Sequence, residues 1–514
     1  MSVSTPSRPG SLLIAALTFL FVALRCLQLD ADPPSSINGR ESRELYAEPP
    51  AKSHEARNFA LFGAFQLSRA DDYQFWRAQS PAWVYPLAGF FHVFGTDYPQ
   101  LRIFSTLYAA LGFALLLAIA HQVSSGGAFV FVGLALAIDA VYFHTARVGF
   151  IEPAVGTWVT LAALALLHAE RNLRWLIVAH VAFVFAFFSK QAAVYALPFI
   201  AFASGYRLLL AFQASDEDRK QAKLVIAAAV LLLVLSGLYI ATSDYVRAVL
   251  HNVNHVILGS DAPPRNQYRG LKTLLFRLRD RERYAHFFSS IPVSGPIAVA
   301  TLLAYGVQAV RTRRWPSYRA FVLLGWFASA LFAMEVLAKS ALRFWTIAVP
   351  PAALVAGLGL ERAREWMRER GTVWTAQRAL IALPLAAAVA WSAYGNFVSL
   401  RRPEYTVRDG AARLQQEIGA RDATVVGFPS PGIVLGTPYK NFYVRGQFNA
   451  ERAQILQLGI THLLLRDGKD ATEDILQREF PSLMKKLQPR AELQVRGESL
   501  KLFDVESRMS SLSK

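Results

Sequence analysis

The stretch LVIAAAVLLLVLSGLYIA (residues 224–241) carries no charged side chain and is long enough to cross the hydrocarbon core of a bilayer as one helix. Similar apolar runs recur along the chain and alternate with short charged loops, which predicts a polytopic α-helical membrane protein. At ~20 residues for each span, we expect about 11 to 13 transmembrane helices. The runs lie near 11–29, 101–121, 127–145, 153–169, 174–189, 191–213, 223–243, 290–310, 319–338, 343–360 and 378–398.

The composition agrees with a membrane protein and argues against nucleic-acid binding. Of 514 residues, 54% are hydrophobic and 18% are charged, and the formal net charge is +17. Most Arg and Lys side chains lie between the apolar runs, where they set topology and face anionic lipid. The single cysteine, Cys26, cannot form a disulfide or a thiolate metal site within the chain.

Loop charge predicts which ends of the helices face the cytoplasm. The basic loops 170–174, 207–223, 311–314 and 361–370 are expected inside. The first loop (30–80), the loop 244–289 and everything after residue 400 are then outside. The short apolar piece 81–95 is interpreted as a re-entrant or interfacial helix, with one further crossing as the alternative. The first apolar run lacks a small-residue cleavage site and is expected to be a retained helix.

The last part of the chain has a different pattern. We divide the chain into a transmembrane domain (1–400), which includes the first outer loop, and an extracytoplasmic soluble α/β domain (401–514). In the second, strands are expected at 423–428 and 461–465, helices at 451–458 and 472–487, and a hairpin from 491–495 and 500–505. A further amphipathic helix at 271–286 suits the membrane surface, although a solvated loop helix fits as well.

The first outer loop is rich in polar and charged side chains. Acidic groups beside a membrane face are what an enzyme needs to deprotonate a hydroxyl or to hold a metal ion. An ordinary solvated loop with helix caps is the alternative. Candidate catalytic residues here are Glu48, Glu55 and Asp72, and candidate substrate-binding residues are Lys52, His54 and Arg57.

Charges inside apolar runs form a second set of candidates, because they are costly there and usually face a cavity. Lys190, Lys339 and Arg343 lie at expected outer ends of spans, where cations could hold a phosphate group. Snorkelling at a helix end is the alternative for Lys, and Glu335 is expected to pair with Lys339. Arg147, a candidate for substrate binding, and Glu152, a candidate for catalysis, lie in another outer turn. There Glu152 either joins the site or only stabilises a helix N-terminus.

These motifs, in this order, resemble those of bacterial and archaeal relatives of the protein O-mannosyltransferases and of aminoarabinose transferase, which share the GT-C membrane glycosyltransferase fold. The resemblance covers roughly residues 10–400. It rests on HEARN at 54–58 followed by LFG at 61–63, on FG at 94–95 before Arg102, on RVGFIEP at 147–153, on KQ at 190–191, and on RF at 343–344 before PP at 350–351. Relatives commonly carry Asp-Glu in the first loop, whereas this chain has Glu48-Pro49, so the base is Glu48 or one of Glu55, Asp32 and Asp72.

The resemblance implies a membrane glycosyltransferase that moves a sugar from a polyprenyl-phosphate donor to an extracytoplasmic acceptor hydroxyl with inversion. Lys190 and Arg343 would hold the lipid phosphate, and Glu48 would line the same cavity. It also implies a multi-pass protein of the bacterial inner membrane. Its partners would be a lipid-linked sugar, membrane lipid and an acceptor, with no nucleic acid. No cofactor is expected apart from a divalent metal ion, which stays open. The alternatives are a transporter or flippase of lipid-linked substrates and a non-catalytic envelope assembly protein.

Overall fold

The computed structural model describes residues 11–34, 36–37, 40–41, 46–124, 126–246, 250, 287, 291–314, 316–336, 342–371, 373–419, 422–445, 448–468, 470–507 and 509. The contacts divide the chain into two compact units. The helical unit contains Met1–Arg25, Thr106–Ala146 and Ile151–Val398. The mixed unit contains Cys26–Ser105, Arg147–Phe150 and Ser399–Lys514. The predicted amphipathic helix at 271–286 and the candidate Lys339 lie outside the described residues, as does the side chain of Glu335.

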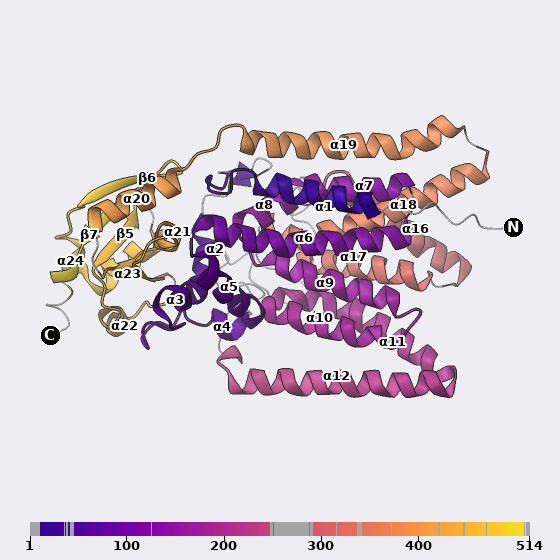
Figure 1. The fold of residues 1–514 in the computed structure, drawn as a ribbon, viewed down its shortest axis with the longest axis horizontal. Coiled ribbons are helices and arrows are strands. Elements are labelled where there is room, and N and C mark those ends of the chain that lie inside the picture. The colour runs from indigo at the N-terminus through magenta and orange to yellow at the C-terminus, as the bar shows by residue number, and fades with distance from the viewer. Residues whose placement is uncertain are drawn as a thin grey trace. The chain divides into compact units, whose positions relative to one another are not determined.

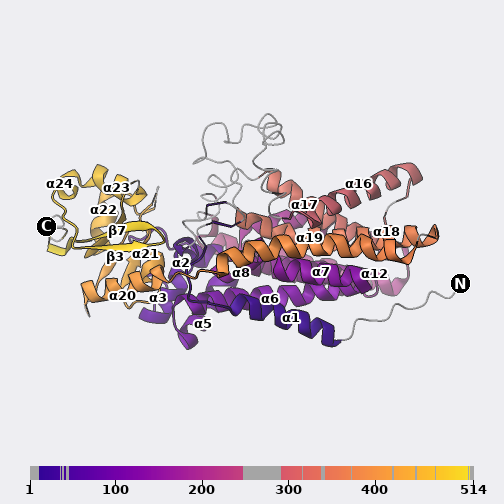
Figure 2. The same ribbon diagram turned by 90° about the horizontal axis from the view of Figure 1, so that it is seen from above.

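Every predicted apolar run is helical in the structure, as Figures 1 and 2 show. This agreement confirms the polytopic α-helical fold. Apart from the ends of α1, α6, α8 and α19, the helices of this part belong to the helical unit. They are α1 (Ser11–Cys26), α6 (Tyr98–Val123), α7 (Gly126–Ile138), α8 (Ala140–Val148), α9 (Glu152–His168), α10 (Trp175–Ser189), η2 (Gln191–Ala196), α11 (Leu197–Gln213), α12 (Asp216–Thr242), α16 (Ser294–Thr312), α17 (Tyr318–Val336), η5 (Leu342–Ile347), α18 (Val349–Glu369) and α19 (Trp374–Leu400).

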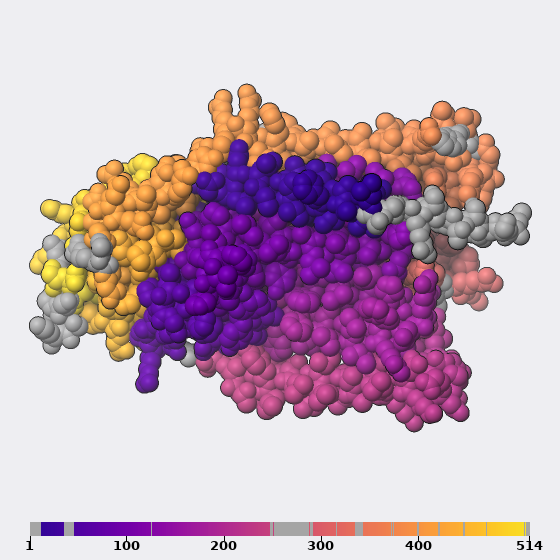
Figure 3. Space-filling model, in the orientation of Figure 1, coloured from indigo at the N-terminus to yellow at the C-terminus, as the bar shows by residue number. Residues whose placement is uncertain are grey.

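Four of the described helices are long and apolar enough to cross a membrane alone, and a bent pair makes up to five. These four are Tyr98–Val123, Gln191–Gln213, Asp216–Thr242 and Thr375–Phe397. Only 6% of the apolar window of α12 is buried within the protein, and α12 forms a rounded ridge on the surface in Figure 3. An apolar helix exposed over almost its whole length suits contact with lipid tails.

The bent pair is α7 and α8, which meet at an angle of 46°. Backbone carbonyls at a break in a membrane helix need other hydrogen-bond donors. Arg25 Nη1 of α1 donates to Ala137 O at 2.9 Å, and Asn396 Nδ2 of α19 donates to Ile138 O at 2.8 Å. Asp139 accepts from Tyr142 N at 2.8 Å and so stabilises the start of α8. Polar side chains of α1 and α19, together with Asp139 at the break itself, therefore stabilise the break.

Close packing joins α16 to α18. Gly359 of α18 faces Thr301 of α16, and a Cβ at position 359 would overlap the Thr301 hydroxyl. Small residues let transmembrane helices approach closely and gain dispersion contacts. The same two helices lie in one continuous apolar core with α7, α9 and α17.

The first part of the mixed unit contains short helices that follow α1. Gly63 ends α3 with φ 73°, a left-handed conformation that glycine adopts without strain, and Gly95 follows α5 with φ 91°. The LFG and FG motifs of the sequence are therefore helix ends. The elements are β1 (Ser36–Ile37), β2 (Arg40–Glu41), α2 (Glu48–Lys52), α3 (His54–Phe62), α4 (Trp76–Gln79) and α5 (Pro81–Phe94).

The tail forms the α/β part of the mixed unit. Its five-stranded sheet has the order β4-β3-β5-β7-β6, with β3 parallel to β4 and β5 and an antiparallel hairpin of β6 and β7 at one edge. The predicted strands and hairpin are confirmed. The predicted helix at 472–487 is divided into two, because Pro481 cannot donate a helical hydrogen bond. The elements are α20 (Thr406–Ile418), β3 (Thr424–Val426), α21 (Ser430–Val434), β4 (Lys440–Phe442), α22 (Arg452–Gln457), β5 (His462–Arg466), α23 (Ala471–Glu479), α24 (Pro481–Met484), β6 (Ala491–Val495) and β7 (Glu498–Asp504).

Candidate active site

Three predicted site residues of the helical unit meet around one carboxylate. Glu152 is the first residue of α9 and is only 2% exposed. Lys190 lies between α10 and η2 in an extended conformation, which ends one helix before the next begins. Its Nζ lies 2.5 Å from Glu152 Oε1, and Arg343 Nε of η5 lies 3.6 Å from the same oxygen. The sequence separates these residues widely, and the fold brings them together.

Both cations of this Glu152–Lys190–Arg343 cluster also face one aromatic ring. Lys190 Nζ is 5.2 Å and the Arg343 guanidinium carbon 4.9 Å from the centroid of Phe344. A ring face stabilises a cation that has lost part of its hydration. Two cations share one carboxylate, so the cluster has a net positive charge and suits an anion such as a phosphate.

Hydrogen bonds of the Thr346 hydroxyl position the backbone of η5, the element that carries Arg343. Thr346 Oγ1 lies 3.0 Å from Thr145 Oγ1 of α8 and donates to Arg343 O at 2.5 Å. The backbone of Arg343 is therefore tied to the helix that begins at the Asp139 break.

Arg147 does not belong to that cluster. It lies in the mixed unit, where its guanidinium donates to Leu27 O at 2.7 Å and to Gln28 O at 2.6 Å. Gln28 has a positive φ of 51°, so the arginine stabilises an irregular turn after α1. The predicted substrate-binding role of Arg147 stays a prediction.

Glu48 and Lys52 face each other on one side of α2. Lys52 Nζ lies 2.7 Å from Glu48 Oε1, an i,i+4 pair, and the ammonium group lies 5.7 Å and 5.8 Å from the rings of Trp76 and Phe150. Lys52 is buried, and Pro49 lies in the first turn of the helix, where a missing N–H costs nothing. The Lys52 ammonium is therefore held by Glu48 and two aromatic rings, while Glu48 stays partly exposed.

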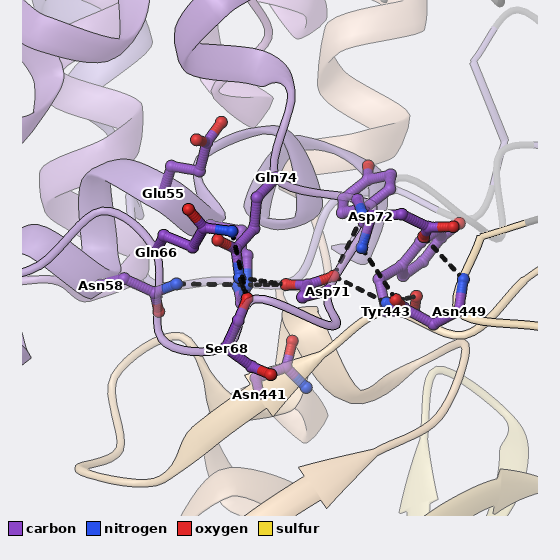
Figure 4. A network of polar contacts seen from close by, with 12 residues as sticks. Glu55, Asn58, Gln66, Ser68, Asp71, Asp72, Gln74, Asn441, Tyr443 and Asn449 are labelled. Carbon is purple, nitrogen blue, oxygen red and sulfur yellow. Dashed lines mark hydrogen bonds and ion pairs between the residues drawn. The ribbon is translucent and has the colours of Figure 1, made fainter. Parts of the chain in front are cut away.

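His54 and Asp71 form the centre of a buried polar network in the same unit. Figure 4 shows the part of this network around Asp71. His54 Nε2 lies 3.6 Å from Asp71 Oδ2 and 3.2 Å from Asn58 Nδ2. Asp71 also accepts from Gln74 Nε2 at 2.6 Å and from Asn449 Nδ2 at 2.7 Å. Its carboxylate is therefore fixed by residues of the first loop and of the tail.

Glu55 lies next to this network and is almost fully buried. Burial raises the pKa of Glu55 to about 7, although the backbone N–H of Arg77 donates to its Oε2 at 2.5 Å and opposes the shift. A carboxyl group with a pKa near the working pH is suited to general acid–base chemistry. The structure supplies this property for Glu55, one of the predicted bases.

Asp72 binds the tail. Its Oδ1 accepts from Asn449 N at 2.7 Å, its Oδ2 accepts from Gln454 Nε2 at 3.2 Å, and its own N–H donates to Asn449 Oδ1 at 3.0 Å. Asn449 has φ 51°, so these bonds stabilise a strained turn. The geometry gives Asp72 a structural task, and its predicted catalytic role stays a prediction.

Arg57 makes the most extensive contact between the first loop and the tail. The buried guanidinium donates to the carbonyls of Val434, Leu435, Thr437 and Tyr439 at 2.7–3.0 Å. These bonds hold the turn between α21 and β4, which belongs to the same mixed unit.

Comparison with solved structures shows the fold. The chain superposes on ArnT from Cupriavidus metallidurans bound to undecaprenyl phosphate with a TM-score of 0.61 and 12% identity, covering 96% of this chain and 97% of that one. The chain has the GT-C fold. The oligosaccharyltransferase of Archaeoglobus fulgidus in complex with Zn and sulfate shares this GT-C fold, with a TM-score of 0.51, 11% identity, and coverage of 88% of this chain and 68% of that one. No protein-family profile matches the sequence, and no curated protein matches it significantly.

Within the GT-C fold, the predicted residues form two groups. Glu152, Lys190 and Arg343 meet in the helical unit, whereas Glu48 and the other first-loop candidates lie in the mixed unit. The prediction that Glu48, Lys190 and Arg343 line one cavity joins residues of both units and stays a prediction.

Sequence reasoning missed Asp71, Asn449 and Phe344. Asp71 adjoins the predicted Asp72, but nothing in the sequence shows that its carboxylate meets His54. Phe344 had a usable signal, because an aromatic residue next to an intramembrane Arg suits a cation–π contact. Within the described parts of the chain, no group of three or more His, Cys, Asp and Glu side chains is arranged to hold a metal ion.

Proposed function

We propose that this membrane protein is a glycosyltransferase that moves a sugar from a polyprenyl-phosphate donor to an extracytoplasmic hydroxyl. The observation that carries the proposal is the convergence of Lys190 and Arg343 on Glu152 at the ends of three apolar helices. Charged side chains within membrane spans cost free energy, and they usually mark the path or the site of a substrate or an ion. ArnT, which shares the fold, is bound to undecaprenyl phosphate in its crystal structure.

In the proposed reaction, the acceptor oxygen attacks the anomeric carbon and forms the new glycosidic bond, with inversion. The bond between that carbon and the phosphate oxygen breaks, and its electron pair stays on the lipid phosphate. Lys190 and Arg343 stabilise the developing phosphate charge. Glu152 holds both cations in place and balances part of their charge when no phosphate is bound.

The acceptor hydroxyl must lose its proton to a carboxylate. We assign this role to the first loop, with Glu48 and Glu55 as the candidates. Glu48 is the residue that the family resemblance favours. Glu55 has a pKa of about 7, so it is a stronger base than an ordinary carboxylate while still partly ionised at neutral pH.

The test is transfer by the purified chain in nanodiscs from labelled polyprenyl-phosphate sugars to a membrane extract. Lys190→Ala and Arg343→Ala should each lower kcat by about 100- to 1000-fold, the usual cost of losing one group that stabilises a transition-state charge. Arg319→Gln is the matched control, because Arg319 pairs with Glu170 at 2.8 Å in the same helical unit and lies outside the cluster. Parent-like transfer by both alanine variants would remove the phosphate site.

The same preparation distinguishes the other candidate functions. A flippase would move the labelled lipid across the bilayer without transferring its sugar. An assembly protein would tolerate Glu48→Gln, Lys190→Ala and Arg343→Ala in cells without loss of function. Either result would replace the glycosyltransferase proposal.

We also propose that the chain resides in the bacterial inner membrane with the mixed unit outside. Since Cys26 is the only cysteine, Cys26→Ser with Gln416→Cys gives a single exposed thiol on α20. A membrane-impermeant maleimide should label that thiol in intact spheroplasts. Labelling only after lysis would place the tail in the cytoplasm and contradict the proposed orientation.

A further inference from the structure

The mixed unit contains a cavity of about 180 Å³ that none of the proposed chemistry uses. It lies between the chain after α1, the start of α6, and the helices α20 and α21. Its volume is comparable to the ~150 Å³ cavity that holds a benzene ring in an engineered protein. The polar side chains that line it are Asp30, Asp32, Asp97, Arg102, Arg408 and Gln415.

Arg102 lines the cavity and is 3% exposed. Its Nη1 donates to the carbonyls of Leu29 and Ala31. Its buried Nε has no hydrogen-bond partner among the described residues. An unused donor on a buried guanidinium is costly, and a ligand oxygen would relieve that cost.

Three carboxylates, those of Asp30, Asp32 and Asp97, line the same cavity. Asp97 is exposed and accepts from Tyr98 N at 2.7 Å, and a Cβ on Gly436 would lie 2.7 Å from Asp97 Oδ1. The absence of a side chain at position 436 therefore gives the carboxylate its place at the cavity. Asp30 pairs with Arg408 at 2.9 Å across the opening.

Both carboxylate oxygens of Asp32, by contrast, already accept hydrogen bonds within the mixed unit. It accepts from Thr406 N at 2.9 Å, from Thr406 Oγ1 at 2.6 Å and from Val407 N at 3.0 Å, and so stabilises the start of α20. The groups left for a ligand are acceptors on Asp30 and Asp97 and donors on Arg102, Arg408 and Gln415.

This mixture excludes simple ions and favours a neutral polyol. The three carboxylates repel an anion, and the guanidinium of Arg102 repels a cation. Hydroxyl groups both donate and accept, so one molecule can satisfy Asp97 and Arg102 together. Ala411 and Ala412 also line the cavity and are accessible, so they supply an apolar surface against which the C–H face of a ring can pack.

We propose that this cavity binds one saccharide ring, whose hydroxyls donate to Asp30 and Asp97 and accept from Arg102 and Gln415. Binding needs no donor lipid and no catalysis. If the proposed glycosyl transfer is correct, the ring belongs to the acceptor. Only this assignment of the ring to the acceptor rests on the proposed function.

The test is saturation-transfer difference NMR on the full chain in nanodiscs. The probes are the methyl glycosides of mannopyranose, glucopyranose, galactopyranose and arabinofuranose. Binding of the ionic alternatives, inorganic phosphate and Mg²⁺, is measured on the same preparation by isothermal titration calorimetry. At least one glycoside should bind with a millimolar Kd. Asp97→Asn should raise that Kd about tenfold by weakening a charged hydrogen bond.

Ala411→Leu fills the cavity from α20 and should abolish the signal, because Ala411 lines the cavity and is only half-buried. Gln416→Leu places the same side chain at an exposed position of α20 outside the cavity and should bind as the parent does. Lys190→Ala should bind glycoside normally even when transfer is lost, which separates this proposal from the proposed function. Parent-like binding by Ala411→Leu, no glycoside binding by the parent up to about 50 mM, or binding of phosphate alone would overturn it.

Discussion

Replacing Arg57 by Met should loosen the tail rather than act directly on a substrate. The guanidinium donates to four backbone carbonyls. Val434 O also accepts from the N–H and from the hydroxyl of Thr437, each at 2.9 Å. The carbonyls of Leu435, Thr437 and Tyr439 would lose the hydrogen bond from Arg57. At about 1 kcal/mol for each buried acceptor, the variant should lose ~3 kcal/mol of local stability.

Hydrogen exchange read by mass spectrometry measures this loss directly. Peptides that cover residues 434–442 should exchange about 100-fold faster in Arg57→Met, since local opening becomes ~3 kcal/mol easier. Although burial lowers the pKa of Arg57 to about 9, the group stays protonated at neutral pH, so the effect should not vary between pH 6 and 7.5. Arg413→Met on α20 is the control, because the Arg413 guanidinium is exposed and its ion pair with Glu417 is long, at 3.8 Å.

The reasoning would be refuted if Arg57→Met abolished glycosyl transfer while the exchange of 434–442 stayed at the parent rate. That result would make Arg57 a substrate-binding residue, as the sequence predicted. Loss of transfer together with faster exchange would instead trace the loss to the turn between α21 and β4.

Three further outcomes are expected. Burial raises the pKa of Glu55 from 4.5 to about 7, so the protonated group contributes about 3 kcal/mol of stability below pH 4.5, and this contribution is lost as the pH rises through 7. The melting temperature of Glu55→Gln should therefore depend less on pH between 4.5 and 7 than that of the parent. An unchanged pH profile would contradict the burial argument. Arg25→Leu leaves Ala137 O without its donor at the helix break and should cost about 2 kcal/mol, measured as a lower melting temperature in detergent, whereas a parent-like melt would show that water replaces the arginine. Gly359→Val forces a side chain against Thr301 and should destabilise the packing of α16 on α18 by about 1–3 kcal/mol in the same melt, with Thr301→Ala expected to restore part of the loss.

The sequence predicted the membrane helices well because bilayer thickness imposes a simple requirement. Each run must be apolar over ~20 residues, and that requirement is visible without any knowledge of packing. The break between α7 and α8 was not predicted. It depends on Arg25 and Asn396, which reach the freed carbonyls from helices far apart in the chain.

The candidate site was predicted in part, for a similar reason. Lys190 and Arg343 are conspicuous because charges are rare inside apolar runs. Their meeting at Glu152 requires the tertiary fold, and the local pattern allowed Glu152 to be no more than a helix-end charge. In the first loop, composition marked the acidic residues but could not separate Glu55 from Asp72. Glu55 is buried so deeply that Arg77 offsets only part of the effect on its pKa, whereas Asp72 binds a turn of the tail.

The bonds from Arg57 to the tail have a consequence for biosynthesis. Arg57 and Tyr439 are 382 positions apart, so at 5–20 residues per second the ribosome needs roughly 20–75 s to supply the second after the first. During that interval the first-loop segment holds the Arg57 guanidinium and the carboxylates of Asp71 and Asp72 without the partners that the tail supplies. A nascent segment of this kind is suited to binding by a chaperone, and a premature stop before β4 should leave a chain that quality-control proteases remove.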